Sequence, residues 1–400
     1  MAAPSFISPR YANAPGSPIR ELKRFSERPG MISFAGGYPD PGLMDAQGLQ
    51  ACLAQLEPAE FARALEYGGT EGDPSLRAEL ARLSRARGLD ARPEDVQVLS
   101  GSQQGIDLLA RTLLCPGDTV LVEAPTYPAA LSAFRFAGAT VHQVPMDQQG
   151  LDIAALEFAM AAHKPKLLYT VPTFGNPTGL TLAAHRRQAV AELAVRYQCL
   201  VIEDDPYGEL YFDQAPPAPI HAARNAVQGA EEVLIYLASL SKTMAPGLRV
   251  GWMLGPAAIR RACVLAKQVD DMHASTLTQT AAARYLKSGA FERHLPTLRE
   301  SYRARAMALF GALEEQFGNR IEMPEPQGGM FMWGRAPGVC AQDWLAAAIE
   351  HGVMFVPGAA FFAEASDPAF FRLSFATQDT AGMREGAGRL SNAMRQLRLR

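Results

Sequence analysis

Short apolar runs alternate with helix-period stretches between about residues 95 and 254, and this alternation limits the possible folds most strongly. Seven of the runs indicate strands, at 96–99, 119–122, 140–144, 167–171, 200–203, 233–237 and 250–254. Helix-period stretches lie between or after them, at 106–113, 183–198 and 256–270. Strands rich in Val, Ile and Leu that alternate with helices are typical of a parallel sheet covered on both faces. We therefore predict an α/β fold with a mostly parallel seven-stranded sheet, which binds ligands at the carboxyl ends of its strands.

The pattern changes after about residue 285, and 400 residues exceed one ordinary core. A long charged stretch at 291–317 indicates a helix, and strand candidates follow at 328–333, 353–356 and 370–375 before a final solvated helix. We therefore predict an N-terminal arm and substrate-gating segment at 1–45, a large ligand-binding domain at 46–285 and a smaller α+β domain at 286–400.

Charge and cysteine content exclude several classes of protein. A net charge of −3 gives no electrostatic reason to bind nucleic acid or an anionic membrane, and no apolar run is long enough to span a bilayer. The five cysteines lack CxxC spacing, so neither a disulfide framework nor a metal site is expected. Residues 1–20 faintly resemble a transit peptide, because they lack acids and carry arginines. We assign 17–37 to the folded protein, however, and predict a cytoplasmic location.

Lys242 lies between two apolar runs, in the segment Ser-Leu-Ser-Lys-Thr-Met-Ala-Pro-Gly-Leu-Arg at 239–249. Burial disfavours the charged form of a lysine, but that cost disappears if the amine is condensed with an aldehyde as a Schiff base. Ser239 and Arg249 place a hydroxyl and a fixed positive charge nearby, and both suit a phosphate. This combination indicates pyridoxal phosphate (PLP) bound covalently to Lys242. The alternative is a strand that ends in an exposed Ser-Lys turn.

Four further motifs follow predicted strands, and each is a weak signal alone. The Gly-Ser-Gln-Gln-Gly turn at 101–105 opens a helix whose free N–H groups suit an anion, although Ser is also a common helix N-cap. Tyr127 is either a stacking partner for a flat ring or an ordinary half-buried tyrosine. Asn-Pro-Thr-Gly at 176–179 either leaves an amide free for a ligand oxygen or is a plain turn. Three successive carboxylates at 203–205 need a cationic partner, such as a protonated pyridine nitrogen.

Together with Gly-Gly-Met-Phe at 328–331 and Phe-Arg-Leu-Ser-Phe at 371–375, these motifs resemble the fold-type I, class I and II PLP-dependent aminotransferases. Their order and spacing match from about residue 17 to the C-terminus. Within the class, the segments at 17–22 and 32–37 are similar to the 2-aminoadipate/kynurenine aminotransferase branch. Tyr38 and the Thr-Phe-Gly segment at 173–175 depart from that branch. Because both adjoin the expected substrate pocket, they leave the substrate open.

The resemblance implies roles for the matched residues. Three are implied to be catalytic: Lys242 carries the cofactor, Asp204 pairs with its ring nitrogen, and Tyr207 donates to its phenolic oxygen, while Asp205 points away. The implied cofactor ligands are Ser102, Gln103, Tyr127, Asn176, Asp204, Tyr207, Ser239, Ser241, Lys242, Arg249 and, from the neighbouring subunit, Tyr67. The implied substrate ligands are Arg372, which clamps the α-carboxylate, together with Gly37, Asn176, Arg20 and Tyr38. A tyrosine shared between subunits implies a homodimer.

The implied reaction moves an amino group from an L-amino acid (2-aminoadipate, glutamate, or an aromatic or aliphatic one) to a 2-oxo acid, with 2-oxoglutarate expected. Cofactor motifs do not separate this from other PLP reactions, so a carbon–sulfur β-lyase, a decarboxylase or a racemase is an alternative. A second alternative is a transcription regulator with an aminotransferase-like domain. We do not favour it, because the segment at 32–36 begins too early to leave room for a DNA-binding domain.

Overall fold

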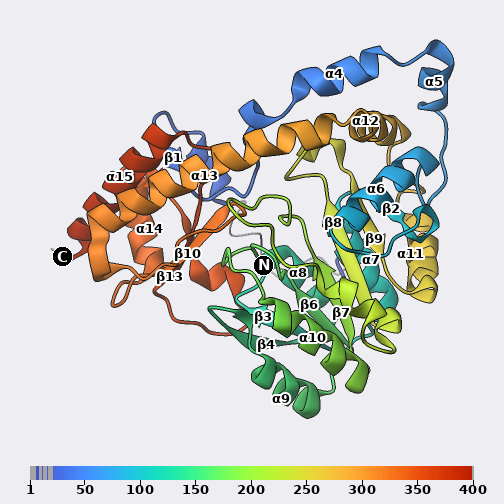
Figure 1. Ribbon diagram of the computed structural model, residues 1–400. Helices are drawn as coiled ribbons and strands as arrows, with labels where there is room; N and C mark the ends of the chain where they lie inside the picture. The colour runs from blue at the N-terminus through green and yellow to red at the C-terminus, as the bar shows by residue number, and fades with distance from the viewer. Residues whose placement is uncertain (1–5, 9–10, 12–15, 17–20, 399–400) are drawn as a thin grey trace.

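The computed structural model describes residues 6–8, 11, 16 and 21–398, and its largest sheet has the strand order β2-β9-β8-β7-β6-β3-β4-β5 (Figure 1). The strands are β2 (Gln97–Leu99), β3 (Thr119–Ala124), β4 (Thr140–Asp147), β5 (Gly150–Leu151), β6 (Leu167–Thr170), β7 (Leu200–Asp204), β8 (Leu234–Ser239) and β9 (Gly251–Leu254). Neighbours from β4 to β8 are parallel, whereas β9 is antiparallel to both β2 and β8. All seven predicted strands are present in this mostly parallel sheet, and the eighth, β5, is a two-residue strand antiparallel to β4.

Helices cover both faces of this sheet. Successive strand residues point to opposite faces, so Val120 and Ile202 pack with α7 and α8, whereas Leu121 and Val201 pack with α9 and α10. These helices are α7 (Ser102–Leu113), α8 (Pro128–Phe136), α9 (Ile153–His163) and α10 (Ala184–Arg196). Burial on both faces explains why the strands are continuous apolar runs and do not alternate with polar residues.

The C-terminal part contains a second, antiparallel sheet in the order β10-β13-β12. It is formed by β10 (Phe331–Arg335), β12 (Val356–Pro357) and β13 (Phe370–Ser374), with helices α13 (Ala290–Phe317), α14 (Ala341–Glu350) and α15 (Thr380–Arg398). The run 353–356, expected as one strand, divides between β11 (Val353–Met354) and β12. Because β11 pairs in parallel with β1 (Ile32–Ser33), the segment that leads to Gly37 is fixed to this part of the molecule. The domain boundaries given above remain a prediction.

The other α-helices within the described residues are α3 (Lys23–Ser26), α4 (Ala46–Ala54), α5 (Pro58–Arg63), α6 (Pro74–Ala86), α11 (Ala257–Asp270) and α12 (Thr276–Lys287). α4 and α5 lie at the rim of the molecule (Figure 1), and neither contains a buried residue. Across the described residues, no helix combines the length and the apolar character that crossing a bilayer requires.

Candidate active site

Lys242 lies in the loop that follows β8, between the carboxyl end of that strand and the start of β9. Its Nζ donates a hydrogen bond of 2.9 Å to the carbonyl oxygen of Gly37, which comes from the segment after β1. A side chain at Gly37 would place its Cβ only 2.8 Å from the ring of Phe331. The glycine therefore lets the N-terminal segment pass close enough for its backbone to contact the lysine.

The environment of Lys242 favours the neutral amine. Burial lowers the pKa of Lys242 to about 8, and the nearby cations Arg372 and Arg249 act in the same direction, whereas Asp204 opposes them. A neutral amine is the form that attacks an aldehyde or accepts a proton. Lys242 is therefore suited to nucleophilic and general-base chemistry near neutral pH.

We expect Lys242 to react with acetic anhydride at lower pH than the exposed lysines of the same chain. Because its pKa is lowered to about 8, the rate should rise steeply between pH 7 and 9 and then level off. The rate at an exposed lysine should keep rising towards its ordinary pKa of about 10.4. Mass spectrometry of the cofactor-free protein after timed acetylation measures each site. A Lys242 rate parallel to that of exposed Lys287 would contradict this prediction.

Asp204, at the end of β7, is a buried carboxylate with one oxygen unpaired. Its Oδ2 accepts a hydrogen bond of 2.8 Å from the Tyr169 hydroxyl, whereas Oδ1 has no hydrogen-bond partner among the described residues. Burial raises the pKa of Asp204 to about 7, although the bond from Tyr169 favours the charged form. A buried, unsatisfied carboxylate oxygen is costly and indicates a missing donor. A protonated ring nitrogen would satisfy it and restore its charge.

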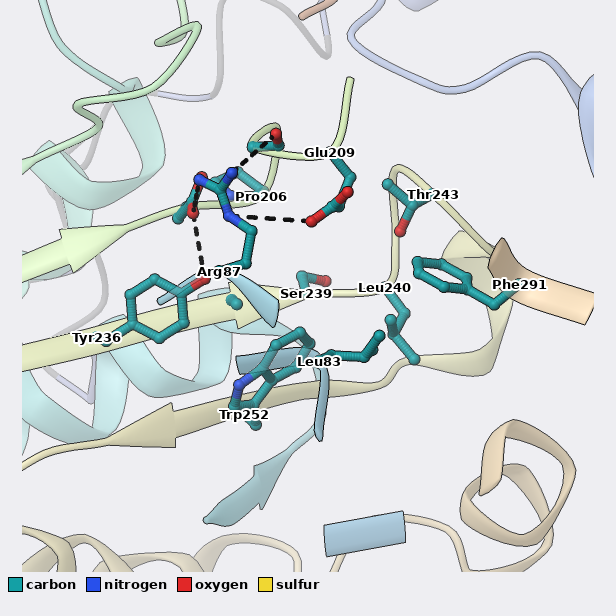
Figure 2. Close-up of a pocket in the computed structure, with 13 residues that line it drawn as sticks. Leu83, Arg87, Pro206, Glu209, Tyr236, Ser239, Leu240, Thr243, Trp252 and Phe291 are labelled. Carbon is teal, nitrogen blue, oxygen red and sulfur yellow. Dashed lines mark hydrogen bonds and ion pairs between the residues drawn. The ribbon is translucent and has the colours of Figure 1, made fainter. Parts of the chain in front are cut away.

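The adjacent Asp205 is committed to other partners. Its Oδ2 accepts hydrogen bonds of 3.1 Å from Arg87 Nη2 and 3.1 Å from the Tyr236 hydroxyl. Arg87, which directly follows α6, also has its Nε 3.9 Å from Glu209 Oε1, and Figure 2 shows both side chains at the edge of a small cavity that Asp205 lines and Asp204 does not. The two neighbouring carboxylates therefore differ in environment: Asp205 forms an ion pair with Arg87, whereas Asp204 forms none with the described residues.

The turn at the start of α7, called the phosphate cradle below, has a geometry that suits an anion. Gly101 has a φ of +85°, and a Cβ there would lie 2.5 Å from Arg249 Nη2. A Cβ on Gly251 would lie 2.8 Å from the backbone nitrogen of Ser102, so β9 and α7 touch closely. The first N–H groups of a helix lack partners within the helix, and they favour an anion such as a phosphate.

Serines and an arginine complete this cradle. The Ser239 hydroxyl donates to Ser241 Oγ at 2.9 Å, and Arg249 Nη1 lies 3.5 Å from the same Ser241 oxygen. Arg249 itself has a left-handed backbone, with φ at +53°. Gln103, also expected at the phosphate, has a buried Oε1 without a hydrogen-bond partner among the described residues.

Arg372, on β13, is buried, and no acidic side chain in the described part of the chain pairs with it. Only 1% of it is exposed, and its guanidinium lies over the rings of Phe331 and Phe361 at 4.3 and 4.8 Å from their centroids. Its Nη1 donates to Asn176 Oδ1 at 2.7 Å, while its Nε has no partner among the described residues. Burial lowers the pKa of Arg372 to about 10, so the group stays charged. A buried arginine near Lys242 whose hydrogen-bond partners are neutral is suited to an incoming carboxylate.

Comparison with known proteins decides the family. The profile described as "Aminotransferase class I and II" matches residues 40–390. The chain is 36% identical to aromatic-amino-acid aminotransferase 1 of Thermococcus litoralis, over 98% of this chain and 94% of that protein. It is 38% identical to the 2-aminoadipate transaminase of Thermus thermophilus, over 95% of this chain and 94% of that protein. The kynurenine aminotransferase of Pyrococcus horikoshii, solved with PMP and kynurenine, superimposes with a TM-score of 0.92 at 37% identity, covering 98% of this chain and 97% of that one.

The chain belongs to the class I and II aminotransferases. The expectation of a PLP-dependent transaminase is thereby confirmed. The β-lyase alternative is not favoured, because the compared relatives are aromatic, 2-aminoadipate and kynurenine aminotransferases. The residues present fit the cofactor. The unpaired Oδ1 of Asp204 suits its ring nitrogen, and the cradle around Gly101 suits its phosphate.

The remaining predicted residues of this aminotransferase lie at different depths. Tyr207 is buried, whereas Tyr38 and Tyr67 are 59% and 81% exposed. Tyr127 caps the start of α8 and packs partly buried against the main core. Arg20 lies outside the described residues.

Phe174 and Tyr169 show what the sequence pattern alone left out. Phe174, part of the segment that departs from the branch, is buried, and Cβ atoms on Gly328 and Gly329 would lie 2.6 and 2.8 Å from it. It thus fills the space above two glycines. Tyr169, the hydrogen-bond donor to Asp204, was not predicted, because a tyrosine in an apolar strand is typical of a core position. Only the pairing of β6 with β7 brings it to that carboxylate.

Proposed function

We propose that this aminotransferase moves an amino group from an L-amino acid (2-aminoadipate, glutamate, or an aromatic or aliphatic one) to 2-oxoglutarate. The observation that carries this proposal is the pairing of a buried lysine of lowered pKa with a buried arginine that lacks an acidic partner among the described residues. The lysine suits chemistry at Cα, and the arginine suits the α-carboxylate that every amino and 2-oxo acid carries. The names of the related transaminases support this range of donors.

When bound, PLP supplies an aldehyde that condenses with amines and a ring that absorbs electrons from Cα. Asp204 would hold the ring nitrogen protonated through its free Oδ1, and Tyr169 would keep this carboxylate in place. Tyr207 and Asn176 would bind the phenolic oxygen, and Tyr127 would stack on the ring. Ser102, Gln103, Ser239, Ser241 and Arg249 would bind the phosphate.

Different residues of the chain would bind the substrate and move its proton. Arg372 would hold the α-carboxylate, which fixes the orientation of Cα relative to Lys242. Once released, the amine of Lys242 would take the proton from Cα as a neutral base and return it to the carbon derived from the cofactor's aldehyde. The lowered pKa of Lys242, about 8, keeps a useful fraction of this base neutral at physiological pH. Gly37, whose carbonyl contacts the amine, would border the substrate.

A spectrophotometric half-reaction screen tests the donor. The purified holoenzyme is mixed with each of the twenty amino acids, 2-aminoadipate and kynurenine, and loss of the PLP absorbance band is followed. We expect conversion with 2-aminoadipate, glutamate or an aromatic donor, and recovery of the band with 2-oxoglutarate. Release of pyruvate and sulfide from cysteine conjugates without this conversion would instead indicate a β-lyase.

Arg20 is proposed as the group that binds the distal carboxylate of a dicarboxylic substrate. Charge-assisted hydrogen bonds of this kind contribute about 1.5–3 kcal/mol each. Arg20→Ala should therefore lower kcat/KM roughly tenfold to a hundredfold for glutamate, 2-aminoadipate and 2-oxoglutarate while sparing aromatic donors. An equal fall for all substrates would point to misplacement of the N-terminal segment instead.

We also propose a homodimer with shared active sites. α4 and α5 contain no buried residue, although Leu53 and Phe61 on them are large and apolar. Leu65 and Tyr67, which follow α5, are 63% and 81% exposed. Exposed apolar side chains gathered along one stretch of chain favour a protein interface. A second copy of this chain is the partner that would cover them and receive Tyr67.

Mixing two inactive chains tests the sharing of Tyr67. A Lys242→Ala chain paired with a Tyr67→Phe chain has one site damaged at both positions and one intact site. After subunit exchange, activity should therefore exceed that of either parent. With an affinity tag on one chain, native mass spectrometry detects the heterodimer by its intermediate mass and so confirms that exchange has occurred. If exchange is complete and activity stays at the parental level, Tyr67 acts within its own subunit.

A cytoplasmic location completes the proposal. All five cysteines are free, including Cys115, which is exposed. Free thiols are in keeping with a reducing compartment. Fractionation of the native host, with the holoenzyme traced by its activity, tests this location.

A further inference from the structure

Lys267, on α11, is a fully buried lysine that the proposed chemistry does not use. None of its surface is exposed, and its Nζ donates hydrogen bonds to Gln104 Oε1 at 2.9 Å and to Asp271 Oδ1 and Oδ2 at 2.6 and 2.8 Å. An ammonium group has three donors, and all three are used here. A buried lysine is costly unless it is paired. Lys267 is thus built into a specific network.

The partners of Lys267 hold the turn that begins the phosphate cradle. Gln104 Oε1 also accepts a hydrogen bond of 2.8 Å from the Ser100 backbone N–H. Asp271 Oδ2 accepts bonds of 3.0 Å from Ser100 Oγ and 2.8 Å from Gln104 Nε2. Ser100 and Gln104 stand at either end of the segment 101–103, which starts α7. The network therefore fixes both ends of the backbone that would face the phosphate.

The same network reaches Arg249. Arg249 Nη2 donates a hydrogen bond of 2.8 Å to the carbonyl oxygen of Ser100. This guanidinium also lies against Gly101, where a Cβ would come within 2.5 Å of Nη2. Movement of Ser100 would consequently displace both the helix start and the arginine. The paired charges of Lys267 and Asp271 largely cancel, so their effect on a phosphate comes through position and not through net charge.

We propose that Lys267 and Asp271 are positioning residues for the cofactor's phosphate: they hold Ser100 and Gln104 so that the start of α7 and Arg249 face that group. This inference rests on the proposed PLP site. It predicts that substitution of these two residues lowers the affinity for ligands that carry the phosphate. The affinity for ligands without a phosphate should stay unchanged. A purely structural role in stabilising the fold would make no such distinction.

Binding of PLP and of pyridoxal, which lacks the phosphate, separates the two roles. The full chain is freed of cofactor, and each ligand is titrated by quenching of tryptophan fluorescence. For Lys267→Met we expect the affinity for PLP to fall on the order of tenfold to a hundredfold, as is typical when a supporting partner of a ligand site is removed. Pyridoxal affinity should stay within about threefold, and inorganic phosphate should compete less well with PLP.

Two further variants keep the test decisive. Lys267→Met with Asp271→Asn removes both charges together, so it avoids an unpaired charge and should fold while showing the same selective loss of PLP affinity. Arg261→Met, which removes an exposed cation from the same helix, should leave both affinities unchanged. Equal losses for PLP and pyridoxal, or no loss in the double variant, would overturn the proposal. A wild type that binds the two ligands equally well would overturn the phosphate cradle itself.

Discussion

Lys242→Ala should no longer hold PLP covalently, and its transamination rate should fall by at least about a thousandfold. The loss combines two roles of one amine, because the substitution removes both the nucleophile for the aldehyde and the base at Cα. General-base catalysis alone contributes roughly 10²–10⁴-fold. The structure adds a physical reason, since Lys242 is the amine whose pKa burial lowers to about 8 beside Arg372 and Arg249.

Borohydride reduction followed by peptide mapping measures this directly. In the wild type the reduced cofactor should lie on the peptide 239–249, and in the variant no labelled peptide should remain. Lys287→Ala, at an exposed lysine on α12, is the matched control and should label like the wild type. Labelling of the wild type at another lysine would refute the assignment.

Asp204→Asn is expected to have the second largest effect. A charge-assisted pair with the ring nitrogen contributes about 1.5–3 kcal/mol, which corresponds to roughly ten- to 150-fold in rate. Loss of the ring proton then adds to this, because an unprotonated ring absorbs electrons less well. The readouts are kcat in the half-reaction and the ¹⁵N shift of labelled PLP, which should move to that of an unprotonated pyridine.

Asp205→Asn should behave differently, although the residue is adjacent. Asp205 pairs with Arg87 at 3.1 Å, and removing one partner of a buried ion pair costs about 3–5 kcal/mol of stability. We therefore expect a lower Tm with kcat nearly unchanged and the ¹⁵N shift unaltered. Adding Arg87→Met should recover part of the lost stability, because no buried charge is then left alone. If Asp205→Asn moves the ¹⁵N shift and Asp204→Asn does not, the assignment of the two carboxylates is reversed.

Much of the fold could be predicted because strands buried on both faces differ in sequence from everything around them. The seven apolar runs all became strands of one sheet, and the helix expected at 291–317 is α13. Short or divided elements were harder to predict from the sequence. β5 has two residues, and the run 353–356 contributes to two different sheets. No local pattern distinguishes such a division, because it depends on which neighbours supply the hydrogen bonds.

For the candidate site, too, some features follow from the sequence and others only from the tertiary structure. The sequence by itself determined which residues are proposed to carry the chemistry, because Lys242, Asp204 and Arg372 stand in motifs that resemble those of the family in order and spacing. The tertiary structure alone decided which partners the buried charged residues around them have. Asp205 is assigned to Arg87, 118 positions away, and Lys267 to Gln104, 163 positions away. Contacts of this range arise when strands and helices pack, and a buried charge is satisfied by whatever the packing brings within about 3 Å. The order of residues along the chain does not show which residues become neighbours in space.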